Sequence, residues 1–450
     1  MIDRSTFGGL TAYFHTFGCK LNFAETSTVT RMLAERGIVR TQRGDRPDLV
    51  VVNTCSVTEL ADKKCRQAIR SMARRWPGVP IAVTGCYAQL KSDEVASLPG
   101  VAIVAGSDHK GDLAEYIERF LRERMPMVEV NPTAQLRSFT PSCERGDRTR
   151  WWLKVQDGCD YYCTYCTIPI ARGRSRSPMV DELVAQATDA AAQGAREIVL
   201  TGVNIGDFGR RNGQTFLQLI EALDRVEGIE RYRISSIEPN LLSDEIIDFV
   251  AASKRFMPHF HVPLQSGSDE VLRLMHRHYD TDLFRRRMEH IRRAIPDAFI
   301  GVDLIVGARG ESEERFEESR SFVESLDITR LHVFPYSERP GTRALDIEGV
   351  VDQAEKHRRS TVMINLSEQK MDRFAARFCG TVRPVLMEHT RRREDGMDLM
   401  SGHTDNYLRV EIPWDASLAN RVVPVLLASD GLPVAATADT PARGVIKPNA

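Results

Sequence analysis

Three cysteines stand close together near the middle of the chain. Cys159, Cys163 and Cys166 form a C-x3-C-x2-C pattern in the segment QDGCDYYCTYC. Three thiolates at this spacing can bind three irons of a [4Fe–4S] cubane and leave the fourth iron open to another ligand. A structural zinc site requires a fourth protein ligand nearby, and no cysteine or histidine follows at the usual spacing. The pattern therefore favours an iron–sulfur cluster over a zinc knuckle.

Three more cysteines lie far apart in the sequence. Cys19 stands in FGCKLN, Cys55 in VVNTCS and Cys86 in VTGCY, and each follows an apolar, strand-like stretch. If those strands are parallel, their carboxyl ends meet at one edge of a sheet, and the thiols converge there. Glycine and small polar neighbours would let the backbone approach a cluster closely. The alternative is three separate thiols buried in a core, where cysteine is common.

Strand and helix patterns alternate around these upstream cysteines. Such alternation is typical of a parallel sheet with helices on its faces. Apolar runs predict strands at 11–17, 48–52, 80–83 and 101–104, and amphipathic runs predict helices at 25–36 and 63–75. We therefore expect an α/β domain over residues 9–130, followed by a polar, proline-containing linker at about 131–150.

A second alternating block contains the C-x3-C-x2-C loop directly after its first strand. The expected strands are 152–156, 197–203, 232–237, 259–264, 299–306 and 329–335, and the expected helices are 180–193, 215–226, 243–252, 269–274 and 313–326. Six strand–helix units predict a partial (βα)6 barrel over residues 145–376. In such folds the chemistry takes place at the carboxyl ends of the strands.

The last part of the chain changes to short β runs joined by turn-rich segments. Strands are expected at 383–388, 407–412 and 422–427. This pattern of short strands and turns predicts a small β-barrel or sandwich over residues 378–440, with a polar and disordered tail from about residue 440. The whole chain is thus expected to be an α/β protein with a C-terminal β domain.

Composition limits the function classes. A chain of 450 residues is long enough for two or three domains. With 61 Lys and Arg against 62 Asp and Glu, net charge neither favours nor excludes a polyanionic partner. Nine cysteines are an odd number and a poor disulfide framework in a reducing compartment. We see no secretory signal and no membrane-spanning stretch, so we expect a cytoplasmic protein that does not bind a membrane.

The C-x3-C-x2-C loop in this context resembles the radical S-adenosylmethionine (SAM) superfamily. The resemblance implies that the cluster on Cys159, Cys163 and Cys166 binds SAM at its open iron and is catalytic. Other strand ends agree with it, in LTGVN, SSIEP and VDLIVG, and IARGRSRS follows the cluster loop. The resemblance places SAM contacts at Gly202, Asn204, Ser235, Ser236, Glu238, Asp303 and Arg172. The alternative for each is an ordinary strand-end turn or cap.

Both cysteine groups together resemble the radical SAM methylthiotransferase family across nearly the whole chain. The segments GCKLN, HVPLQSGSD and FPYSERPGT are most similar to its MtaB type. The resemblance implies a second [4Fe–4S] cluster on Cys19, Cys55 and Cys86. It also implies conversion of N6-threonylcarbamoyladenosine, beside the anticodon of tRNA, to its 2-methylthio derivative. An electron donor and a sulfur source would be further partners.

The sequence departs from this family at two places. VGARG carries Ala308 and Arg309 where relatives usually have GFPG, and Cys65 is an additional cysteine, more typical of a buried helix thiol than of a ligand. Alternatives with the same chemistry are isopentenyladenosine in tRNA or a small-subunit ribosomal protein as substrate. An alternative of another class is a non-catalytic RNA-binding protein with structural metal.

The C-terminal β domain resembles a TRAM domain around GHTDNY at 402–407. The resemblance implies RNA binding, in which Arg391–Arg393, Tyr407 and Arg409 would combine phosphate contacts with base stacking. The alternative for the arginine run is a solvated turn. Arg172, Arg174 and Arg176, after the cluster loop, would lie at the active-site rim, where arginines can bind substrate phosphates or the SAM carboxylate.

Overall fold

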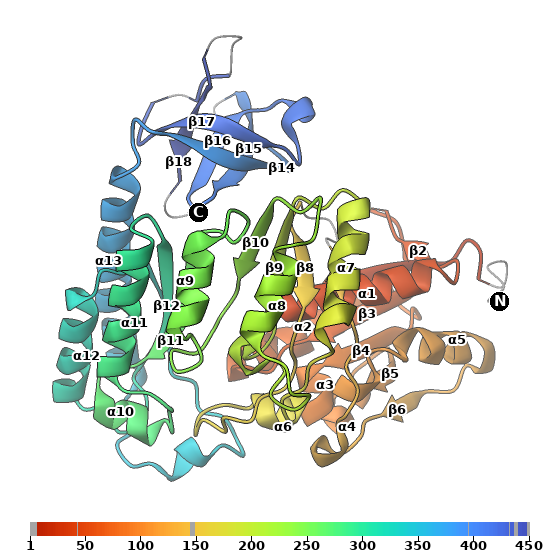
Figure 1. The fold of residues 1–450 in the computed structure, drawn as a ribbon. Coiled ribbons are helices and arrows are strands. Elements are labelled where there is room, and N and C mark those ends of the chain that lie inside the picture. Colours follow the sequence, from red (N-terminus) through yellow and green to blue (C-terminus); the bar gives the residue numbers. More distant parts are fainter. Residues whose placement is uncertain are drawn as a thin grey trace.

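The computed structural model describes residues 7–42, 44–144, 149–394, 396–431, 433–435 and 440–447. An N-terminal α/β unit, a central open barrel and a C-terminal β-barrel follow one another along the chain (Figure 1). The α/β class and the three-part architecture expected from the sequence are confirmed.

The N-terminal unit is a six-stranded parallel sheet with the strand order β2-β1-β3-β4-β5-β6. β3 is buried along its whole length, which is why it reads as a continuous apolar run. The strands are β1 (Thr11–Thr16), β2 (Val39–Arg40), β3 (Leu49–Thr54), β4 (Ile81–Gly85), β5 (Val101–Ala105) and β6 (Met127–Glu129). The helices are α1 (Lys20–Ala34), α2 (Glu59–Arg75), α3 (Cys86–Leu90), α4 (Ser92–Ala96) and α5 (Leu113–Glu123).

Six parallel strands in chain order form the central barrel. They are β8 (Trp151–Lys154), β9 (Glu197–Thr201), β10 (Arg231–Ile234), β11 (His259–Gln265), β12 (Phe299–Val306) and β13 (Arg330–Pro335). β8 to β10 form one hydrogen-bonded group and β11 to β13 another, and isolated parallel bridges such as Ser236–His261 join the two. The barrel is therefore open, and the short antiparallel β7 (Cys143–Glu144), within the expected linker, extends its edge at β8.

Most helices of this unit cover the outside of these strands, whereas the short helix at 168–172 lies against α3 of the N-terminal unit (Figure 1). They are α6 (Ile168–Arg172), α7 (Val180–Ala192), α8 (Phe216–Leu223), α9 (Asp244–Ala252), α10 (Asp269–Leu274), α11 (Thr281–Ala294), α12 (Glu313–Ser325) and α13 (Gln353–Ala376). The sequence did not predict α11 or the long α13. None of the described helices is long and apolar enough to cross a membrane.

The C-terminal domain is a closed barrel with the strand order β14-β15-β16-β18-β17. Its strands are β14 (Val382–Glu394), β15 (Met397–Thr404), β16 (Arg409–Pro413), β17 (Val422–Ala428) and β18 (Ala442–Ile446). The expected disordered tail from about residue 440 is wrong, because β18 pairs antiparallel with β16 and parallel with β17 and so closes the barrel. The domain therefore extends past residue 440. Residues 436–439 and 448–450 lie outside the described residues.

This β-barrel sits over the amino ends of the central strands (Figure 1). Arg231, at the start of β10, donates to the carbonyl of His403 at 3.1 Å, and the rings of His259 and Tyr407 are 4.4 Å apart. The C-x3-C-x2-C loop follows the opposite, carboxyl end of β8. The two features thus lie at opposite ends of the barrel strands.

Candidate active site

The first cysteine group lies in the loop between β8 and α6. The Cys166 amide donates to the Cys163 carbonyl at 3.0 Å, and the amides of Tyr161 and Ile168 donate to the sulfurs of Cys159 and Cys166 at 3.5 and 3.4 Å. Burial raises the pKa of all three thiols, that of Cys166 to about 12. Three such thiols become thiolates only beside a strong positive charge, which a bound metal supplies.

Arg277, just after α10, contacts this group. Its guanidinium donates to the Cys163 sulfur at 3.0 Å and forms an ion pair with Glu238. Arg277 is therefore a site residue that the sequence analysis missed. A single arginine in MHRHY has no spacing signal, and only the fold brings it to the loop.

The second cysteine group lies at one edge of the N-terminal sheet. β1, β3 and β4 are neighbours; Cys19 caps α1 after β1, Cys55 follows β3, and Cys86 begins α3 after β4. Burial, together with the nearby thiols of Cys86 and Cys19, raises the pKa of Cys55 to about 12, so the three thiols are close enough to interact.

Glycines allow the backbone to pass close to these thiols. Gly18 has a φ of +100°, and a Cβ there would lie 2.9 Å from the Cβ and 3.0 Å from the sulfur of Cys55. Gly85, with a φ of +101°, packs directly on the Thr54 backbone. Cys65 lies fully buried on α2 with its thiol donating to the Cys55 carbonyl, as a helix thiol would.

The loops that carry the two cysteine groups touch each other. The Thr167 hydroxyl, next to Cys166, donates to the carbonyl of Ser56 at 3.2 Å. Arg339, in the segment after β13, donates to the Ser56 hydroxyl at 2.7 Å and to Asp62 at 3.0 Å. Both groups therefore face the same region between the N-terminal unit and the barrel.

A cavity of about 470 Å³ is lined by all three units of the chain, and Cys19 is the one cysteine among the described residues that line it. Of the residues that the structure describes, three cationic side chains and no carboxylate line it, so it favours an anionic ligand. The lining residues that matter here are Cys19, Lys20, Arg150, Gly202, Arg233, Ser235, Ser236, His259, His261 and Tyr407.

Two family models match the chain. One, described as "Uncharacterized protein family UPF0004", matches residues 11–106, and that of the Radical SAM superfamily matches residues 153–323. Among curated proteins, threonylcarbamoyladenosine tRNA methylthiotransferase MtaB of Bacillus subtilis is 38% identical over 94% of this chain and 95% of its own length. The chain belongs to the radical SAM methylthiotransferase family.

Other relatives agree with this assignment. MtaB of Thermotoga maritima is 35% identical over 89% of this chain and 91% of its own length. The tRNA-2-methylthio-N(6)-dimethylallyladenosine synthase of Thermobifida fusca is 34% identical over 87% of this chain and 81% of its own length. A solved structure of the radical SAM methyltransferase TsrM from Kitasatospora setae has a TM-score of 0.54 at 16% identity, covering 75% of this chain and 77% of that one, and shows the likeness of the fold alone.

This methylthiotransferase uses SAM and [4Fe–4S] clusters, and the residues at the strand ends fit such ligands. Both polar side-chain atoms of Asn204 are buried without a hydrogen-bond partner among the described residues, so they are available to a bound ligand. Gly202 leaves no room for a side chain, because a Cβ there would lie 2.9 Å from the Gln156 carbonyl. Ser235 and Ser236 line the cavity.

One expected SAM contact of this methylthiotransferase is wrong. Arg172 is 1% exposed, and its terminal nitrogens donate to Glu25, Asp157 and Asn22 at 2.6 to 3.2 Å. A guanidinium whose terminal N–H groups are all used inside the protein has none left for a SAM carboxylate. Arg172 instead joins the N-terminal unit to the barrel.

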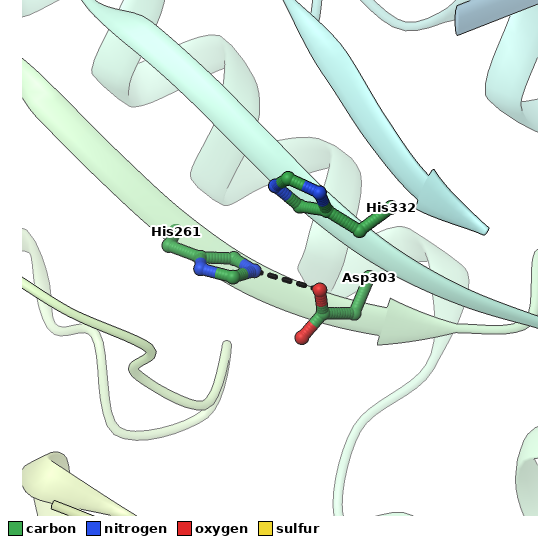
Figure 2. A group of neighbouring side chains, drawn as sticks. All are labelled: His261, Asp303 and His332. Carbon is green, nitrogen blue, oxygen red and sulfur yellow. Dashed lines mark hydrogen bonds and ion pairs between the residues drawn. The ribbon is translucent and has the colours of Figure 1, made fainter. Parts of the chain in front are cut away.

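Asp303 is placed differently from the expectation of a strand-end contact with SAM. It lies in the middle of β12 and accepts from the His261 ring at 2.7 Å, with His332 beside it (Figure 2). The signal in the sequence is alternation, because His259-Phe-His261 and Arg231-Tyr-Arg233 put polar residues on one strand face. The apolar partners Phe260 and Tyr232 pack in the core under the helices.

The RNA-facing residues expected in the C-terminal domain divide into two groups. Tyr407 is half-buried at the junction with the central barrel, where its ring lies 4.4 Å from that of His259 and lines the cavity. Arg391 and Arg392 are exposed on the β14–β15 hairpin, although each is paired with a carboxylate. Arg309, in the departure from the family pattern, pairs with Glu338 at 3.0 Å and so holds a neighbouring loop.

Proposed function

We propose that this enzyme converts N6-threonylcarbamoyladenosine, next to the anticodon of tRNA, to 2-methylthio-N6-threonylcarbamoyladenosine. The observation that carries the proposal is that the loops of the two cysteine groups touch each other through Thr167 and Ser56, and that Cys19 also lines the cavity between the N-terminal unit and the barrel. The names of the relatives from Bacillus subtilis and Thermotoga maritima support this substrate.

In this proposal Cys159, Cys163 and Cys166 hold the cluster that binds SAM, and Cys19, Cys55 and Cys86 hold the second. When bound, these groups supply the reductive cleavage of SAM and the sulfur that reaches adenine C2. The protein binds and orients: Asn204, Ser235 and Ser236 supply polar contacts to SAM. Arg277 holds Glu238 and the Cys163 sulfur in place, and a base bound in the cavity would exclude water from the reacting atoms.

The partners follow from the size and place of the cavity. An unpaired nucleotide of the anticodon loop can enter it without melting a duplex. The exposed arginines of the β14–β15 hairpin would contact phosphates elsewhere on the anticodon stem-loop. An electron donor, a sulfur source and a cytoplasmic location belong to the same proposal.

The test is mass spectrometry of tRNA nucleosides from cells with and without the gene. We expect the 2-methylthio-threonylcarbamoyladenosine peak to vanish without the gene and to return with the wild-type chain. An unchanged peak, or loss of 2-methylthio-isopentenyladenosine instead, would refute the substrate. If neither nucleoside changes and a ribosomal protein loses its methylthio group instead, tRNA is refuted as the target.

Purified variants test the two cysteine groups. Cys163→Ala should abolish SAM cleavage, whereas Cys55→Ala should spare cleavage and stop sulfur insertion. The intact protein should bind about eight irons under anaerobic conditions. Zinc in place of iron would favour a non-catalytic RNA-binding protein, and equal loss of both activities in the two variants would contradict separate roles for the clusters.

A further inference from the structure

Lys20 is the one cation of the cavity without a partner among the described residues. It follows Cys19 at the start of α1 and lines the cavity. Arg150 donates to the Tyr407 hydroxyl at 3.2 Å, and Arg233 pairs with Glu197 at 2.8 Å. No hydrogen bond or ion pair in the described part of the chain uses the Lys20 ammonium. A free ammonium inside a carboxylate-free cavity is a site for an anionic group.

His261, which lines the cavity, belongs to a compact group of polar side chains. His261, Asp303 and His332 come from the neighbouring strands β11, β12 and β13 and point toward one another (Figure 2). The His261 and His332 rings are 5.1 Å apart. Burial, with the charge of His261, lowers the pKa of His332 to about 4, so this ring is neutral at physiological pH. The charge of Lys20 also acts on His332, which places the two within electrostatic range.

We propose that Lys20, His261, Asp303 and His332 form the subsite for the threonylcarbamoyl substituent of the target adenosine. The Lys20 ammonium binds the carboxylate of the threonyl group, and the two imidazoles hydrogen-bond its hydroxyl and ureido groups. The inference rests on the proposed function and names the residues that read its substrate.

The position of Lys20 suits this role for a chemical reason. Adenine N6, which bears the substituent, lies on the same base edge as C2, which receives sulfur. Lys20 is the direct chain neighbour of Cys19, a residue of the second cysteine group. Binding the substituent at Lys20 therefore brings C2 toward that group. A dimethylallyl substituent has no carboxylate and would gain nothing from this ammonium.

A transition-metal site is the competing use of the same three side chains, because their ligand atoms lie within 4.8 Å of one another. Two observations favour the substrate. Asp303 already holds the His261 ring at 2.7 Å, and the cavity beside the group is lined by three cations, which disfavour a further one.

The experiment compares anticodon stem-loop RNAs that carry threonylcarbamoyladenosine or its neutral carboxamide at the target position. Binding to the cluster-loaded enzyme is measured by fluorescence anisotropy, and product formation gives KM and kcat. We expect the wild type to bind the carboxylate RNA at least about tenfold more tightly, and Lys20→Met to remove this preference while iron content stays the same. Lys63→Met, an exposed lysine on α2, is the matched control and should keep it.

His332→Gln should weaken binding of both RNAs by a similar factor, because the imidazole meets neutral groups that they share. Undiminished carboxylate preference in Lys20→Met would overturn the inference. So would a metal ion beyond the cluster irons that is present in the wild type and lost in His332→Gln. If the wild type modifies isopentenyladenosine RNA and not threonylcarbamoyladenosine RNA, the proposed function itself fails. If it modifies the latter and Lys20→Met does so with unchanged KM, only the inference fails.

Discussion

At the scale of single residues, the contacts around the cysteines determine what the two groups can hold. Cysteine patterns and strand ends could be predicted from the sequence, because spacing and apolar runs are local signals. Arg277 and Lys20 could not be predicted in this way. Arg277 belongs to no spaced motif and reaches Cys163 only through the fold, and the place of Lys20 in the cavity depends on lining residues from segments far apart in the chain.

Arg277→Gln should lower the rate of SAM cleavage by about 10- to 100-fold, since Cys163 would lose a charged donor and Glu238 its counter-charge. The measurement is formation of 5′-deoxyadenosine by the reconstituted enzyme. Arg273→Gln, which breaks only an exposed pair with Glu270, is the control and should behave as the wild type. Equal rates in both variants would contradict a positioning role for Arg277.

Gly18→Ala should reduce bound iron from about eight to about four per chain and leave SAM cleavage intact. The added methyl would press on Cys55, in a backbone conformation that side chains rarely adopt. Gly9→Ala is the control: Gly9 has a similar φ of +96° but open space around it. This variant therefore shows the effect of backbone strain without steric crowding. Iron analysis and cleavage assays are the measurements, and a full iron count in Gly18→Ala would count against the crowding argument.

At the scale of elements, the sequence predicted the long buried strands well and the short strands at the sheet edges poorly. The strand at 299–306 matches β12, whereas β2 and β6 have two and three residues at the two edges of their sheet and carry little pattern. α13 escaped prediction because it buries polar residues such as Lys356 and Arg359 along with its apolar ones. Tertiary ion pairs such as Arg359–Glu311, at 2.9 Å, make this burial favourable. Because charged residues occupy buried positions, the sequence of this helix shows no clear apolar periodicity.

α1 also carries a buried charged residue, Glu25, which ion pairs stabilise at the junction between the N-terminal unit and the barrel. Burial would raise the pKa of Glu25, but Arg172, Lys110 and Lys154 lower it well below its ordinary value. The charged form therefore stabilises the fold at neutral pH. This contribution is complete above the ordinary pKa of about 4.5 and is lost progressively as the pH falls below it.

Glu25→Gln should lower the free energy of unfolding by about 3–5 kcal/mol at pH 7, because it leaves buried cations without their counter-charge. The difference from the wild type should shrink below pH 4.5, where the wild-type carboxylate progressively loses its advantage. Urea denaturation across this pH range is the measurement. Glu123→Gln, at the exposed end of α5, is the control, and an equal loss at every pH would contradict the electrostatic cause.

At the scale of the whole molecule, the junction between the central barrel and the C-terminal domain forms one end of the cavity. Tyr407 lies there against Arg150, Arg233 and His259. Burial would raise the pKa of Tyr407, but Arg150, Lys20 and Arg233 lower it to about 8. Because this is below the ordinary value near 10, the group contributes stability that appears as the pH rises above 8.

One tyrosine should therefore ionise near pH 8 in a spectroscopic titration, ahead of all unperturbed ones. Arg150→Met should move that titration to higher pH, because it removes the largest neighbouring cationic effect. Tyr407→Phe should eliminate the early step. Persistence of the early step in Tyr407→Phe would assign it to another residue.

The closure of the C-terminal barrel by β18 also has a consequence for biosynthesis. β16 and β17 keep open edges until Ala442–Ile446 has pairs to make with them. During translation the N-terminal unit and the central barrel can begin to fold as they leave the ribosome, but this domain waits for the last strand. A nascent chain released before residue 442 would expose two strand edges, which favour aggregation. Quality control of this enzyme would thus act on incomplete chains before they meet RNA.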